Sequence, residues 1–105
     1  MNLKPIIYVL SLLFMTATAA QAHTPLCACF DNGDNTITCE GGFSDGSSAS
    51  GVAMRIEASD GTILMEGAMD ADSTFTFTRP ESDFTVIFDA GEGHVIEVPD
   101  RNIIF

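Results

Sequence analysis

The chain has 105 residues and a formal charge of −11 at pH 7, with fifteen acidic residues against four basic ones. A chain of this length forms one small domain, and so acidic a surface repels nucleic acid and anionic lipid. These properties exclude a multidomain protein and argue against nucleic acid or a lipid surface as a partner.

The first 22 residues have the pattern of an export signal. Lys4 precedes an apolar run over residues 6–15, and small residues follow that end in Ala20-Gln21-Ala22, as in a cleaved secretory leader. The apolar run is shorter than the about 20 residues that a membrane-spanning helix needs, so direct membrane insertion is not expected. Cleavage after Ala22 would give a periplasmic or secreted protein, residues 23–105, that begins with His23.

Short β-type runs separated by turn residues follow, in the rhythm of a β-sandwich. Apolar and polar residues alternate in several of these runs, as expected for half-buried strands. The serine- and glycine-rich residues 44–51 are expected to form a loop. We predict an all-β fold, a single antiparallel β-sandwich of about seven strands, with strands at residues 27–31, 36–43, 52–58, 62–66, 74–78, 84–89 and 94–98.

Three cysteines lie in or beside the first predicted hairpin, and an exported protein meets an oxidising compartment that favours a disulfide. With Gly33 at the hairpin tip, Cys27 would face Cys39, and Cys29 would project from the same face of the ribbon. The pairing depends on the register, so the sequence predicts a disulfide from Cys39 to either Cys27 or Cys29. Soft-metal binding by the thiols and packed free thiols are the alternatives.

Several motifs resemble a known family. The motifs are Gly42-Phe43-Ser44-Asp45-Gly46, Asp60-Gly61-x-x-Leu64-x-Glu66-Gly67, Asp70-x-Asp72 and Phe75-x-Phe77. In this order they resemble a carboxypeptidase-regulatory-like (transthyretin-type) sandwich. The closing stretch from Val86 to His94, with His23 after Ala-x-Ala, resembles the small periplasmic accessory proteins of nickel and cobalt uptake transporters. The resemblance covers about residues 22–98. It implies transition-metal capture and a membrane metal-uptake transporter as partner.

His23 and His94 are the only histidines of the chain. The α-amine and the ring Nδ1 of an amino-terminal histidine can bind one metal ion together, and imidazole suits nickel, cobalt, copper and zinc. We expect His94 to supply a third nitrogen, and Asp89 or Glu92 to act as a fourth ligand or a supporting group. The resemblance favours nickel or cobalt, whereas copper would bind with higher intrinsic affinity.

Catalytic motifs are scarce. The sequence has no Gly-x-Ser-x-Gly motif and no nucleophile with a credible base nearby, so no enzymatic activity is expected. The leading hypothesis is an exported metal-binding accessory protein that captures nickel or cobalt or delivers it to an uptake system. The alternatives are a non-catalytic periplasmic structural or protein-interaction module, and a copper carrier.

Overall fold

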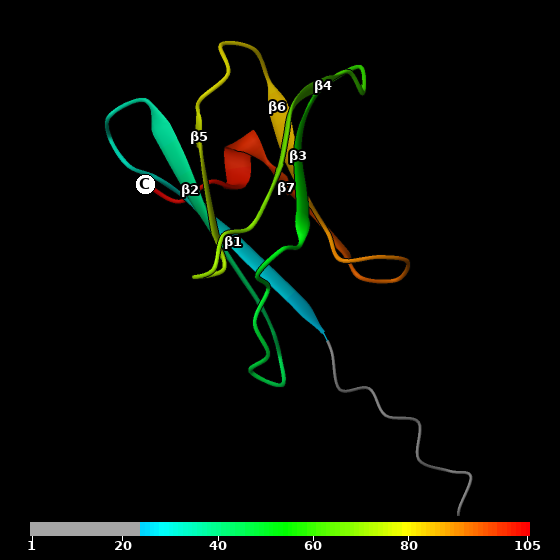
Figure 1. Ribbon diagram of the computed structural model, residues 1–105. Helices are drawn as coiled ribbons and strands as arrows, with labels where there is room; N and C mark the ends of the chain where they lie inside the picture. The colour runs from blue at the N-terminus through cyan, green and yellow to red at the C-terminus, as the bar shows by residue number, and fades with distance from the viewer. Residues whose placement is uncertain (1–23) are drawn as a thin grey trace, which may run out of the picture.

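Residues 24–105 are described by a computed structural model, in which two antiparallel sheets carry all the regular strands (Figure 1). The first sheet has the order β1-β2-β5, formed by β1 (Pro25–Asp31), β2 (Thr36–Phe43) and β5 (Thr74–Thr78). The second sheet has the order β4-β3-β6-β7, formed by β3 (Ala53–Ala58), β4 (Ile63–Ala68), β6 (Phe84–Asp89) and β7 (Val95–Pro99). A short 3₁₀ helix, η1 (Asp100–Asn102), follows. The predicted seven-stranded all-β fold is confirmed.

The alternation of apolar and polar residues explains which side chains form the core. In β5, Phe77 is buried while its neighbour Thr76 is exposed, and in β3 the inward-facing Met54 and Ile56 are buried. β6 lies between two other strands of its sheet and is almost wholly apolar, as its interior position requires. The buried side chains from both sheets form one core cluster, which also includes Cys29, Ile37, Cys39, Ala49, Met69, Phe84, Val86, Phe88, Val98 and Ile103.

β1 and β7 belong to different sheets but run in the same direction along one side of the sandwich (Figure 1). After η1 the chain reaches Ile104, which forms a parallel bridge with Phe30 of β1. The amide of Ile104 donates to the Cys29 carbonyl at 3.0 Å, and the Asp31 amide donates to the Ile104 carbonyl at 2.8 Å. The start of β1 and the turn before β7 therefore lie at the same end of the molecule. Within residues 24–105 no helix is long and apolar enough to cross a membrane.

Aspartates organise several turns by accepting hydrogen bonds from backbone amides. In the turn before β5, Asp70 Oδ1 accepts from the amides of Asp72 and Thr74 at 2.9 and 3.0 Å, and Asp70 Oδ2 accepts from the Thr74 hydroxyl at 2.8 Å. These bonds favour the ionised carboxylate. The pKa of Asp70 is therefore lowered from 3.8, chiefly by the amide and then by the hydroxyl of Thr74.

Acidification is expected to remove the stability that the ionised Asp70 contributes. Because its pKa is lower in the folded chain, the unfolded chain binds more protons as the pH falls below about 4, and stability is lost in that range. We expect Asp70→Asn to weaken the fall in urea midpoint between about pH 5 and about pH 3. The matched control is Asp72→Asn, which removes an exposed carboxylate from the same turn. Equal pH dependence in the two variants would contradict this assignment.

Candidate functional site

The turn between β6 and β7 carries His94. The Ala90 amide donates to the His94 carbonyl at 3.0 Å, and the His94 amide donates to the Gly91 carbonyl at 2.9 Å, which closes the turn. Gly91 and Gly93 have φ angles of +111° and +80°, values that glycine adopts without the steric cost of a Cβ. His94 is half-buried, and its Nδ1 lies 3.1 Å from the Glu92 carbonyl oxygen.

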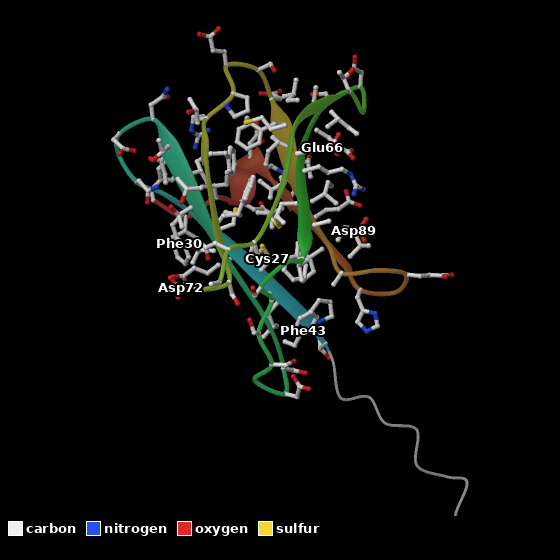
Figure 2. All side chains as sticks on the ribbon, viewed as in Figure 1. Cys27, Phe30, Phe43, Glu66, Asp72 and Asp89 are labelled. Carbon is white, nitrogen blue, oxygen red and sulfur yellow. A yellow bond between two sulfur atoms is a disulfide. The ribbon has the colours of Figure 1, made fainter. Side chains whose placement is uncertain are left out.

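Asp89, labelled in Figure 2, uses both of its carboxylate oxygens within the protein. Oδ2 accepts from Arg55 Nη1 at 3.0 Å, and Oδ1 accepts from the Gly91 amide at 3.0 Å. The Arg55 guanidinium, and after it the Gly91 amide, lower the pKa of Asp89. Arg55 also contacts Glu57. Asp89 is thus suited to holding the histidine turn in place, whereas the exposed Glu92 leaves its carboxylate at the surface.

The predicted ligand His23 lies outside the described residues. The next residue, Thr24, is held by two hydrogen bonds: its amide donates to Ser44 Oγ at 3.1 Å, and its carbonyl accepts from the Ser44 amide at 2.9 Å. The start of β1, which follows Thr24, lies at the same end of the molecule as the β6–β7 turn (Figure 1). Within residues 24–105, His94, Asp89 and Glu92 do not gather their ligand atoms into one cluster.

The cysteines do form a cluster. Cys29 and Cys39 face each other across β1 and β2 and form a disulfide, whereas Cys27 faces Gly41 and is a free thiol. The predicted disulfide from Cys39 is thus confirmed, and its partner is Cys29. The prediction that Cys27 faces Cys39, which assumed a hairpin tip at Gly33, is wrong. Asp31 pairs with Ile37, so the hairpin is centred on Asp34. Each β1 residue therefore faces a β2 residue two positions further along the chain than the one that a tip at Gly33 predicts. A shift by two positions keeps side chains on the same face.

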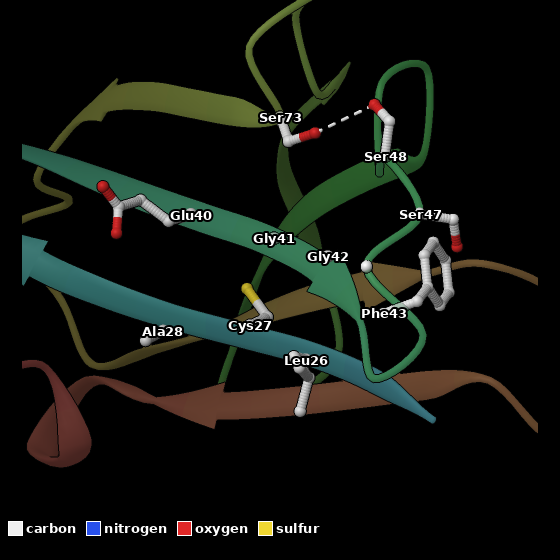
Figure 3. Close-up of a pocket in the computed structure, with 11 residues that line it drawn as sticks. Leu26, Cys27, Ala28, Glu40, Gly41, Gly42, Phe43, Ser47, Ser48 and Ser73 are labelled. Carbon is white, nitrogen blue, oxygen red and sulfur yellow. Dashed lines mark hydrogen bonds between the residues drawn. The ribbon is translucent and has the colours of Figure 1, made fainter. Parts of the chain in front are cut away.

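The space around Cys27 was not anticipated from the sequence. Cys27 helps to line two surface pockets, of about 540 Å³ and about 260 Å³. The larger is also lined by Gly41 and Gly42, which Figure 3 shows on β2 beside Cys27. The glycine pair was the sequence signal that could have pointed to this pocket, because glycine inside a strand often marks a place where another group comes close to the backbone. Burial raises the pKa of the Cys27 thiol to about 11, so it stays protonated at neutral pH.

The described residues thus offer two chemically distinct features: a histidine turn at one end of the sandwich, and a thiol beside a disulfide between β1 and β2. The disulfide is consistent with an oxidising, extracytoplasmic location. Comparison of the chain with protein-family models, with curated proteins and with solved structures finds no match.

Proposed function

We propose that the protein is an exported metal-binding accessory protein. Its two histidines would capture a divalent transition metal, with nickel or cobalt favoured, and present it to a membrane uptake system. The observation that carries the proposal is that β1 starts, directly after Thr24, at the same end of the molecule as the β6–β7 turn. His23 is bonded to Thr24, and consecutive Cα atoms are only about 3.8 Å apart.

The setting of His94 supports its role as a ligand. In the tautomer that donates Nδ1–H to the Glu92 carbonyl, Nε2 keeps its lone pair for a metal ion. The exposed Glu92 carboxylate can contribute an oxygen ligand, whereas Asp89 is committed to Arg55 and Gly91. An imidazole with a nearby carboxylate fits a borderline divalent ion such as nickel or cobalt.

Capture and release require no chemical reaction, so the proposed role is not catalytic. The α-amine of His23, with an ordinary pKa near about 8, must lose its proton to bind the metal. Affinity should therefore rise with pH across the neutral range. A site at the surface with an open coordination position would allow the ion to pass to a transporter.

Metal binding by the secreted protein is the direct test. Native mass spectra with nickel, cobalt, copper and zinc should show one bound ion for the wild type, and the same spectra report the first residue. Binding should be lost in His94→Ala and in a variant with alanine inserted before His23, which separates the α-amine from the ring. The matched control is Asp60→Asn, which removes one charge from the turn after β3. This turn lies at the opposite end of β3 from Ala53, the residue that pairs with Asp89. The control should bind the metal as the wild type does.

A different outcome would favour a second candidate function, a protein-interaction module. The proposal of metal capture fails if the wild type binds no ion, or if all variants bind alike through diffuse attraction to the acidic surface. The observation that favours the second candidate is β4, an edge strand on which Ile63 and Leu64 are 49% and 40% exposed. An exposed apolar edge strand offers its backbone to a strand of another chain.

A further inference from the structure

Three sulfur atoms meet on the inner face of the β1–β2 hairpin. The Sγ atoms of Cys27, Cys29 and Cys39 all lie within 4.8 Å of one another, and two of them form the disulfide. A thiolate beside a disulfide can attack one of its sulfurs and exchange partners with it. The cluster therefore holds both reactants of a thiol–disulfide exchange.

Of the three cysteines, only Cys27 lines both pockets, and Cys29 lines the smaller one as well. Cys29 and Cys39 are 1% and 0% exposed, so an external thiol cannot contact their bond without local opening of the fold. Cys27 is half-buried, and it lines the pocket of about 540 Å³ (Figure 3) as well as the pocket of about 260 Å³. It is opposite Gly41 in the β1–β2 register.

We propose that Cys27 is the attacking thiol of a disulfide relay, through which external dithiols exchange electrons with the buried Cys29–Cys39 bond. The Cys27 thiolate attacks Cys39 Sγ, the Cys27–Cys39 bond forms, and Cys29 leaves as a thiolate that takes up a proton. Attack on Cys39 is preferred because Cys27 and Cys29 lie on one strand, two residues apart. Such Cα atoms are about 6.6 Å apart, near the upper limit for a disulfide.

The migrated disulfide then includes the accessible sulfur. One thiolate of an external dithiol attacks Cys27 Sγ, which releases Cys39 as a thiol and forms a mixed disulfide at Cys27. The second thiol of the reagent attacks its own sulfur in that mixed disulfide and releases Cys27. The dithiol is oxidised to a disulfide by two electrons, and Cys29 and Cys39 are reduced. The reverse sequence would pass a disulfide out of the protein.

The rate of reduction by dithiothreitol tests this relay. Oxidised full-length protein of the wild type, Cys27→Ser and Cys27→Ala is treated with the reagent. The reaction is quenched with iodoacetamide in denaturant, so that buried thiols are alkylated too, and the products are analysed by mass spectrometry. We expect both variants to be reduced at least about tenfold more slowly, because the reagent must then wait for local opening of the fold. The wild-type rate should keep rising toward pH 11, as the Cys27 thiol ionises.

Partial unfolding cannot imitate this result, because a destabilised variant would expose its disulfide and be reduced faster. Early samples of the wild type should also contain a species alkylated at Cys29 that retains a Cys27–Cys39 bond. Fragment ions must show whether the alkyl group is on Cys27 or on Cys29, since only Ala28 separates these two cysteines. Equal reduction rates in the wild type and both variants would overturn the proposal. So would early alkylation that never falls on Cys29 alone.

Discussion

Phe88→Ala is expected to lower the free energy of unfolding by about 3–5 kcal/mol, the usual cost of emptying a buried aromatic site. Phe88 is 0% exposed on β6, and its ring lies 6.1 Å from the Phe43 ring, centroid to centroid. A Cβ added to Gly41 would lie 2.7 Å from Phe88 Cε2, so this ring fills the space beside a glycine of the opposite sheet. Removing the ring therefore opens a cavity between the two sheets.

Urea denaturation followed by circular dichroism measures this loss, since residues 24–105 contain no tryptophan or tyrosine. The matched control is Phe105→Ala, which makes the same chemical change at a side chain that is 93% exposed. It should change stability by less than about 0.5 kcal/mol. Similar losses in the two variants would show that Phe88 does not join the sheets as described.

The second large effect is expected from removing the Cys29–Cys39 bond. The cysteines are ten residues apart in sequence, and closing a loop of this size stabilises the fold by about 2–3 kcal/mol through the unfolded chain. A domain of this size has a small core and little stability to spare. We therefore expect the double variant Cys29→Ala/Cys39→Ala to have a much lower urea midpoint, or to remain unfolded.

Cys27→Ala is the control for this experiment, because it removes a neighbouring sulfur and leaves the disulfide intact. Its urea midpoint should fall less than that of the double variant. Measuring the reduced wild type as well separates loss of the bond from loss of the buried sulfur atoms. A double variant as stable as Cys27→Ala would show that the disulfide contributes little to the stability of the fold.

Much of the candidate chemistry was visible in the sequence, but the contacts that define it were not. The strands at 74–78 and 84–89 were predicted with the bounds that the structure has, since turn residues mark where such runs end. The link between Arg55 and Asp89 was not predicted, because the two residues lie on different strands, 34 positions apart. That contact depends on the β3–β6 register, and it gives Asp89 a role in holding the turn.

The sequence by itself determined the local properties of the chain. Alternation placed the three cysteines on one face, and turn residues separated the seven strands, because both depend on neighbours within a few residues. Tertiary structure decided which cysteines bond, since the register follows from where the hairpin is centred. It also placed the accessible Cys27 beside the buried disulfide and the start of β1 at the same end as His94. The position of β1 beside the β6–β7 turn arises from packing between segments that are distant in sequence, which no local pattern encodes.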